Sequence, residues 1–288
     1  MTCEAAPVSL VERIKDLSEA AEVVALAGGH QSCVFEVTGR DGQRSVAKVV
    51  EAALVDVSEV VARNEAVAEL ARLDASVCRP LPQAGQLVTV FDDDDRTFVL
   101  TRCEFAEGAP PDPADPDDAE LMGRALGELH VSLARLKRRD IPHVAALRAA
   151  GVEDSESFQL LHGDFSVENL RQNHRAVRVF DFDDCGYGPR EFDIANAVYM
   201  VLFTSMTTEE ACGPDGFAAA FLAGYETSPA PPPPRDMING YVDLRVRALE
   251  SWLDDLTTAP IGIRSATPSW HQTLRSFISR YESRPPCG

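Results

Sequence analysis

The sequence predicts an α+β fold made of an N-terminal antiparallel sheet with one helix and a mainly helical C-terminal part. The N-terminal third consists mostly of short apolar runs between turn residues, which is the pattern of strands and hairpins. The C-terminal part has apolar residues at helical spacing. Residues 104–118 between them are rich in Pro, Asp, Ala and Gly, which argues against a helix or a central strand there. We therefore expect two lobes, 1–102 and 103–288, with a hinge at about 101–108.

In the N-terminal lobe, turn and capping residues indicate where the elements begin and end. Gly42 supplies the permissive backbone of a hairpin turn at 40–43. Asp56 and Glu59 have the spacing of a capping box, so a helical run is expected after them, ending at about Leu73. The other elements expected here are a helix, or a helix leading into a strand, at 10–26, and strands at 33–38, 45–50, 87–91 and 97–101.

The C-terminal lobe is expected to consist of helices joined by connecting segments. The proline-rich run 229–234 suits a stiff polyproline II connector between two of them. The helices are expected at 119–137, 194–204, 215–225, 237–256 and 270–281.

Composition and charge exclude several classes of protein. With 45% hydrophobic and 25% charged residues, the chain of 288 residues is an ordinary globular protein rather than a disordered or fibrous one. Its formal net charge of −19 repels nucleic-acid phosphates and anionic lipids, so neither is an expected partner. We expect a cytoplasmic protein, because no apolar run is long enough to cross a membrane, no signal peptide is evident, and the seven scattered cysteines favour reduced thiols.

Two apolar runs, 158–161 and 177–182, flank a polar loop that carries the most informative motif of the chain, LLHGDFSVENL. We expect the runs to form a β-hairpin-like unit that presents Asp164, Asn169 and Asp181 at one end. The spacing from Asp164 to Asn169 is that of the aspartate and the asparagine in the catalytic loop of protein kinases.

These residue types suit phosphoryl transfer to a hydroxyl group. The reaction needs a carboxylate that orients the hydroxyl and accepts its proton, and Asp164 is expected in that role. It also needs oxygen ligands that hold Mg²⁺ against the nucleotide phosphates, which Asn169 and Asp181 supply. Asp183 is either a second metal ligand or a carboxylate at the end of a strand.

HGDFSVENL, together with FDFDD and GYGPREFDIA further on, resembles the motifs of the aminoglycoside phosphotransferase and choline kinase family, and the resemblance extends over most of the chain. It implies a two-lobed, protein-kinase-like fold and a small-molecule kinase that uses ATP and Mg²⁺, with GTP left open. The family's catalytic aspartate falls on Asp164, and its metal ligands fall on Asn169 and Asp181. Ser166 departs from the pattern, because many members carry His or Asn there.

The resemblance also assigns roles in the N-terminal lobe, which it identifies as nucleotide-binding. Lys48 in SVAKV matches the lysine that contacts nucleotide phosphates, and Glu65 on the following helix is the expected partner of that lysine. The phosphate-binding loop falls on 28–34, which lacks the three-glycine pattern of protein kinases. Gln31 and Ser32 are expected to contact phosphate in this loop.

The hinge that contacts adenine is expected near 101–105, because EFAEG, which begins with Glu104 and Phe105, resembles the family's hinge exit. Such a hinge offers backbone hydrogen bonds, so its side chains do not distinguish ATP from GTP.

Three residues near the motif are interpreted as structural. His162 is expected to organise the loop rather than to act as a base. Asp193 is expected to hydrogen-bond the catalytic loop from the start of a helix, and His130 to lie in the core or at its boundary.

The acceptor is expected to be a small molecule, because the stretch from Asp181 to Asp193 is too short for the activation segment on which protein kinases bind peptides. One expected helix carries a stripe of carboxylates, Asp243, Glu250 and Asp254, which suits a cationic acceptor. We expect a cationic antibiotic of the aminoglycoside or basic peptide type, and hence a role in antibiotic resistance or self-protection.

Other functions stay open. A metabolite kinase acting on choline, an amino alcohol or a sugar would need the same catalytic residues. An atypical protein kinase is a further alternative. A non-catalytic nucleotide-binding scaffold is the least expected, because Lys48, Asp164, Asn169 and Asp181 are all present.

Overall fold

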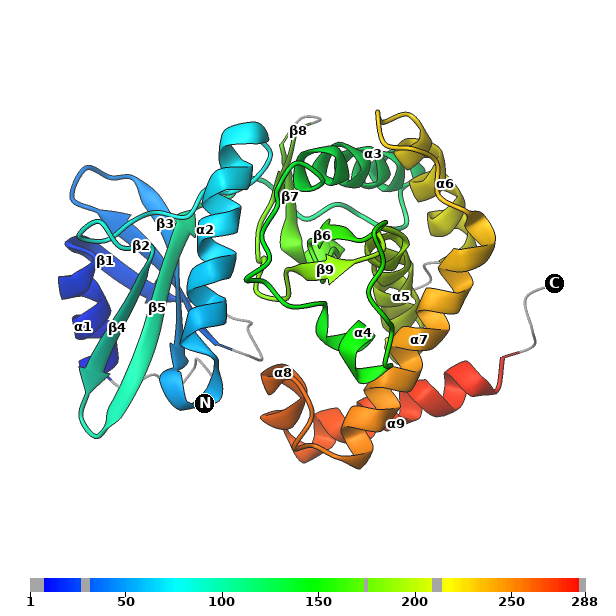
Figure 1. The fold of residues 1–288 in the computed structure, drawn as a ribbon. Helices are drawn as coiled ribbons and strands as arrows, with labels where there is room; N and C mark the ends of the chain where they lie inside the picture. The colour runs from blue at the N-terminus through cyan, green and yellow to red at the C-terminus, as the bar shows by residue number, and fades with distance from the viewer. Residues whose placement is uncertain (1–7, 27–31, 174–175, 209–213, 285–288) are drawn as a thin grey trace. The chain divides into compact units, whose positions relative to one another are not determined.

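The chain forms two compact units in a computed structural model (Figure 1). Unit 1 comprises the residues up to Ala106 together with Ile261–Ala266, and unit 2 comprises Glu107–Pro260 and the residues from Thr267 onwards. The structure describes residues 8–26, 32–173, 176–208 and 214–284.

A five-stranded antiparallel sheet forms the centre of unit 1, and the strand order is β1-β2-β3-β5-β4. The short alternating runs of the sequence are these strands, so the expected sheet is confirmed. The N-terminal segment is a helix leading into a strand. The strands are β1 (Ala20–Ala25), β2 (Cys33–Gly39), β3 (Arg44–Glu51), β4 (Val88–Asp93) and β5 (Arg96–Glu104).

Helix α2 of unit 1 begins where its capping residue indicates. Asp56 caps α2 by accepting hydrogen bonds from the backbone amides of Ser58 and Glu59, as its position in the sequence predicts. The helical elements of unit 1 are α1 (Val8–Leu17), the 3₁₀ turn η2 (Ala52–Leu54), α2 (Val57–Leu73) and α8 (Ile261–Arg264).

The core of unit 1 lies between α1 and one face of the sheet. Leu10 and Ile14 of α1 are fully buried there. Side chains alternate across a strand, so Ala47 and Val49 of β3 face this core and Lys48 between them faces the other side. The strand residues in this core are Cys33, Phe35, Val37, Ala47, Val49, Phe91, Phe98 and Leu100, together with Ala20.

Unit 2 is built mainly from helices. Gly224 lets α6 approach α3 closely, because a Cβ at this position would lie 1.9 Å from the Glu120 carbonyl oxygen. The largely buried helix α5 packs on α7 and α9 (Figure 1). No helix in the described ranges is both long and apolar enough to cross a lipid bilayer. The helices are α3 (Pro116–Leu133), α4 (Ala145–Ala149), α5 (Glu191–Thr207), α6 (Pro214–Glu226), α7 (Arg235–Asp254) and α9 (Pro268–Glu282).

Helix α3 begins three residues earlier than the sequence pattern suggests. Asp115 accepts a hydrogen bond from the Asp117 amide as the N-cap, and Pro116 occupies the first helical position. Proline is tolerated there because the amide hydrogen it lacks would have no partner within the helix. The expectation that the whole of 104–118 is non-helical was therefore wrong at its last three residues.

The expected pairing around the polar loop was also wrong. The run before the loop, β6, pairs with β9, and the run after it, β8, pairs with β7. Strand β7 lies much closer to β8 in sequence than β6 does, so its pairing costs less loop-closure entropy. The elements concerned are β6 (Gln159–Leu161), the 3₁₀ turn η3 (Val167–Asn169), β7 (Leu170–Asn173), β8 (Ala176–Val179) and β9 (Gly186–Gly188).

Candidate active site

Gly163 fixes the path of the loop that carries Asp164. Its φ of +86° is in the left-handed region, which side chains with a Cβ rarely adopt. A Cβ at this position would also lie 2.0 Å from the carbonyl oxygen of Asp184. The sequence HGD therefore requires glycine at its centre for two independent reasons.

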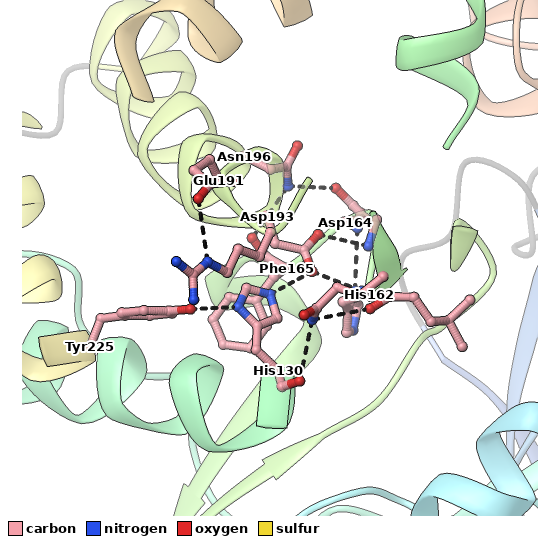
Figure 2. A network of polar contacts seen from close by, with 12 residues as sticks. His130, His162, Asp164, Phe165, Glu191, Asp193, Asn196 and Tyr225 are labelled. Carbon is pink, nitrogen blue, oxygen red and sulfur yellow. Dashed lines mark hydrogen bonds and ion pairs between the residues drawn. The ribbon is translucent and has the colours of Figure 1, made fainter. Parts of the chain in front are cut away.

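Asp193, near the N-terminus of α5, holds this loop in place (Figure 2). Its Oδ2 accepts a hydrogen bond from the His162 amide at 2.8 Å, and its Oδ1 accepts one from the Gly163 amide at 2.8 Å. The Asp193 side chain is fully buried, so both bonds are shielded from water. This geometry matches the structural role expected of Asp193.

His130 of α3 extends the network into the core of unit 2. Its Nε2 donates to Asp193 Oδ2 at 3.2 Å, since the carboxylate can only accept, and its Nδ1 lies 2.9 Å from the Tyr225 hydroxyl (Figure 2). His130 is 2% exposed, which matches the expected core position. Burial raises the pKa of Tyr225, so the phenol stays protonated. The contact with Tyr225 was not foreseen, because nothing in the sequence links these distant residues.

His162 connects the catalytic loop to the end of β8. Its Nε2 donates to the Phe180 carbonyl at 3.0 Å, and its Nδ1 accepts from the Asp164 amide at 3.3 Å. The ring is therefore neutral with its hydrogen on Nε2. Both nitrogens are used inside the fold, which matches the loop-organising role expected of His162.

The Asp164 carboxylate is held at both oxygens by amide side chains. Asn169 Nδ2 donates to Oδ2 at 3.2 Å and to the Asp164 carbonyl at 2.8 Å. Asn196 Nδ2 donates to Oδ1 at 3.2 Å and to the Phe165 carbonyl at 3.2 Å. Asn196 is fully buried in α5 and was not singled out from the sequence. The signal that points to it is its position three residues after Asp193, on the same side of the helix.

Asn169 and Asp181 are brought together by the β7–β8 pairing. Leu170 lies opposite Val179, and the Phe180 amide donates to the Asn169 carbonyl at 3.2 Å. Asp181 then turns away from the strand with a φ of +66°, a left-handed conformation. The structure therefore places the two predicted metal ligands next to each other.

Asp184 was not predicted, and it is surrounded by negative charge. Burial raises its pKa to about 7, and the charges of Asp164 and Asp183 act in the same direction. The Arg245 guanidinium opposes this, and Asp181 adds a smaller upward effect. The catalytic loop and the strand end thus form a concentrated negative region that favours a bound cation.

The oxygen donors near this region fit Mg²⁺ bound together with phosphate. Asn169 uses its amide nitrogen on Asp164, so its Oδ1, which makes no hydrogen bond with any described residue, is available as a ligand. Asp181 adds a carboxylate, and the exposed Asp183 lies two residues further on. Within the described ranges, no three His, Cys, Asp or Glu side chains form a metal site by themselves. That suits Mg²⁺, which usually takes one or two carboxylates and completes its shell with phosphate and water.

The residues predicted in the nucleotide-binding lobe lie in unit 1. Lys48 is half-buried in the middle of β3, opposite Val34 of β2 and Thr101 of β5. Glu65 is exposed on α2. Ser32 directly precedes β2, whereas Gln31 lies outside the described residues.

At the predicted hinge, the side chains of Glu104 and Phe105 and the backbone amide of Glu104 contact other residues of unit 1. The Glu104 carboxylate pairs with Arg79 at 3.1 Å, and the Glu104 amide donates to the Arg79 carbonyl at 3.0 Å. The Phe105 ring lies beneath the Arg44 guanidinium, 3.6 Å from its Cζ. Both predicted side chains thus have structural partners.

The predicted acceptor residues Asp243, Glu250 and Asp254 are all exposed on α7. Asp243 accepts a hydrogen bond from the Tyr281 hydroxyl, and Asp254 pairs with Arg275 at 3.3 Å. Two of the three carboxylates are therefore engaged with α9.

Comparisons with known proteins agree with this site. The model of the phosphotransferase enzyme family matches residues 134–237, which include the catalytic loop and both predicted metal ligands. Amicoumacin kinase of Bacillus subtilis (strain 168) is 24% identical over 222 residues. That alignment covers 65% of this chain and 66% of the relative, slightly less than two thirds of its length.

Solved structures show the same fold. An amicoumacin kinase in complex with AMP-PNP and Ca²⁺ is 20% identical, with a TM-score of 0.75, covering 98% of this chain and 95% of that one. A microcompartment-associated aminopropanol kinase is 19% identical, with a TM-score of 0.69 and coverage of 95% and 94%. A spectinomycin phosphotransferase in complex with ADP and spectinomycin is 11% identical, with a TM-score of 0.60 and coverage of 96% and 94%.

The family match rests on the segment that carries the catalytic motif, and the structural matches extend over nearly the whole chain. They support the predicted enzyme class, an ATP-dependent phosphotransferase. The predicted resemblance to the aminoglycoside phosphotransferase family, and with it the protein-kinase-like fold, is thereby confirmed.

Proposed function

We propose that the chain transfers the γ-phosphoryl group of ATP to a hydroxyl group of a small molecule. The observation that carries this proposal is the Asp164 carboxylate, fixed at both oxygens by Asn169 and Asn196 and close to the predicted metal ligands. A carboxylate held in this way can orient a hydroxyl group and accept its proton as the new P–O bond forms.

Other residues of the two units are proposed to bind the metal ion and the nucleotide. Asn169 through its Oδ1 and Asp181 through its carboxylate would hold Mg²⁺, with Asp183 as a further candidate ligand. The metal ion, when bound, neutralises charge on the phosphate oxygens. Lys48 is proposed to contribute positive charge to the nucleotide phosphates, with Glu65 orienting it, and Ser32 is proposed to donate to phosphate. Transfer is direct, from the nucleotide to the acceptor.

For the acceptor we propose a cationic, hydroxyl-bearing antibiotic, which would make the chain a resistance or self-protection kinase. The similarity to amicoumacin kinase and to aminoglycoside phosphotransferases supports this choice. The negative charge around Asp164 and Asp184 would attract a cation. The exposed carboxylates of α7 are a second candidate contact for it.

An amino alcohol is the second candidate acceptor. The specific observation in its favour is the similarity to an aminopropanol kinase over 95% of the chain. An amino alcohol carries the same two groups, a hydroxyl and a cationic amine, on a smaller framework.

The test is ADP release from MgATP with a panel of basic antibiotics and amino alcohols. We expect turnover with at least one compound, and Asp164→Asn should lower kcat by about 10²- to 10⁴-fold while nucleotide affinity is retained. Asp236→Asn is the matched control, because Asp236 is exposed on α7. Undiminished turnover in Asp164→Asn would refute the proposed role of this carboxylate.

A further inference from the structure

Two polar side chains close to Asp164 have no hydrogen-bond partner among the described residues. Tyr199 of α5 is 5% exposed, and its hydroxyl makes no hydrogen bond with any of them. The Arg245 guanidinium of α7 likewise makes no hydrogen bond or ion pair with a described residue, and its Nε is buried without a partner. A buried donor without a partner costs about 1–3 kcal/mol, so the Arg245 Nε calls for a specific explanation.

Both side chains lie close to the catalytic carboxylate. Asn196, which donates to Asp164 Oδ1, precedes Tyr199 by three residues on the same side of α5, a distance of about one helical turn of 5 Å. The Cζ of Arg245 lies 5.1 Å from the centre of the Tyr199 ring and 5.8 Å from that of Phe192. A row of side chains thus runs through unit 2 where α5 packs on α7, in the order Asp164, Asn196, Tyr199 and Arg245.

The hydrogen-bond donors of Tyr199 and Arg245 favour a ligand group that presents oxygen atoms to them. Arg245 is close enough to oppose the rise in the pKa of Asp184 but does not pair with it. Burial raises the pKa of Tyr199, with Arg245 acting against the rise and Asp164 adding to it, so the phenol remains a hydrogen-bond donor. A guanidinium presents five N–H donors in a planar fork that matches a carboxylate or a carbonyl group.

We propose that Tyr199 and Arg245 form an acceptor subsite that binds a carboxylate or carbonyl oxygen carried close to the reacting hydroxyl group. The proposal rests on the phosphotransferase function proposed above and narrows its substrate class. The acceptor is a hydroxylated amine that also bears such an oxygen group. A purely cationic polyamine or a simple amino alcohol would leave both donors unused.

Three small probes test this, because they share one hydroxyl and one amine. 1-Amino-2-propanol has no oxygen group on the amine-bearing carbon, L-threonine has a carboxylate there, and L-threoninamide has a neutral carbonyl. Binding is measured by calorimetry on the full chain saturated with AMP-PNP and Mg²⁺, and ADP release is measured in parallel with ATP. The threonine and threoninamide results separate a requirement for charge from a requirement for a carbonyl oxygen.

We expect at least one of the two oxygen-bearing probes to bind about 10- to 100-fold more tightly than 1-amino-2-propanol, as charge-assisted hydrogen bonds allow. Arg245→Gln should abolish this preference without changing the affinity for AMP-PNP, and Tyr199→Phe should weaken it. Arg245→Lys keeps the positive charge but loses the planar fork of donors, so this variant should retain only part of the preference for the oxygen-bearing probes. Arg247→Gln is the matched control, since Arg247 is exposed on the same helix.

Each outcome has a distinct meaning. A preference that is lost in Arg245→Gln, without ADP formation by the unaltered protein from these probes or from any compound of the panel above, would support the subsite as a binding site and refute the phosphotransferase. ADP formation with no preference among the probes would refute the subsite and leave the phosphotransferase in place. Failure of the unaltered protein to bind either oxygen-bearing probe would also refute the subsite. An equal loss of affinity for all three probes and for AMP-PNP in Arg245→Gln would show that Arg245 only balances the carboxylates, which also refutes it.

Discussion

The single side chain of Asn196 positions the catalytic carboxylate, because its amide nitrogen donates both to Asp164 Oδ1 and to the Phe165 carbonyl. In Asn196→Ala both acceptors lose this donor, and the carboxylate is free to rotate about its remaining contact with Asn169. We expect kcat to fall by about 10- to 100-fold because orientation is lost, while the KM for ATP stays nearly unchanged. Steady-state ADP release, with an acceptor that the panel described above shows to turn over, measures this.

The control for this variant is Asn239→Ala, since Asn239 is exposed on α7 and far in sequence from the catalytic loop. A circular-dichroism melt of both variants separates lost orientation from lost stability. Wild-type kcat in a folded Asn196→Ala would contradict the positioning role.

The sequence predicted some of these residues and not others, for a physical reason. His162 and Asp193 belong to contiguous motifs, HGD and FDIA, whose spacing indicates what each side chain contacts. Asn196 and Tyr225 contribute through contacts 32 and 95 residues away in the chain. The spacing of Asn196 from Asp193 places both on the same side of α5 but does not identify the partner of Asn196, and a tyrosine at a helix end carries no local signal of its partner, so both contacts required the fold.

At the scale of elements, the β2–β3 hairpin contains a charge pair that makes its stability depend on pH. Glu36 Oε1 lies 2.6 Å from Arg44 Nε, and this hydrogen bond is the main cause that lowers the pKa of Glu36. A carboxylate with a lowered pKa stabilises the folded state above its unfolded pKa, and this contribution is lost as the pH falls through the folded pKa. We expect Glu36→Gln to cost at most about 1 kcal/mol at pH 7, and nothing at a pH low enough to protonate Glu36 in the folded state.

Urea unfolding at pH 7 and at this low pH checks this, with Glu22→Gln on the neighbouring strand β1 as the control. The difference between the two variants at pH 7 should shrink in high salt, because the pair is partly exposed. The same cost at both pH values would point to packing rather than charge.

Sequence reasoning located most elements but failed on one pairing. Turn residues separate β2 from β3 and β4 from β5, and the strands of unit 1 pair with sequence neighbours except where β3 pairs with β5, so their pattern largely determines the sheet. The strands around the catalytic loop are only three or four residues long, and runs that short suit several partners equally well. The expected closeness of Asp164 and Asn169 is nevertheless found, because Asn169 Nδ2 donates to Asp164 Oδ2 within the loop whichever strand pairs with β6.

At the scale of the whole molecule, the net charge of −19 opposes folding through self-repulsion, which salt relieves by screening. We therefore expect added Mg²⁺ to stabilise the protein in two ways, by general screening and by binding at the proposed site. Sodium chloride at matched ionic strength supplies most of the screening without binding at the site. AMP-PNP strengthens the binding of Mg²⁺, because this ion is usually held jointly by carboxylates and phosphate.

We expect Mg²⁺ with AMP-PNP to raise the unfolding free energy by about 2.7 kcal/mol at a ligand concentration 100 times the Kd, beyond what matched sodium chloride produces. Asp181→Asn should lose most of this increment but keep the response to salt. Glu153→Gln removes one charge at an exposed position of the same unit and should keep both responses. Thermal unfolding followed by calorimetry measures all of these effects. An equal increment in Asp181→Asn and the unaltered protein would show that the stabilisation does not depend on this carboxylate, and would remove Asp181 from the set of metal ligands.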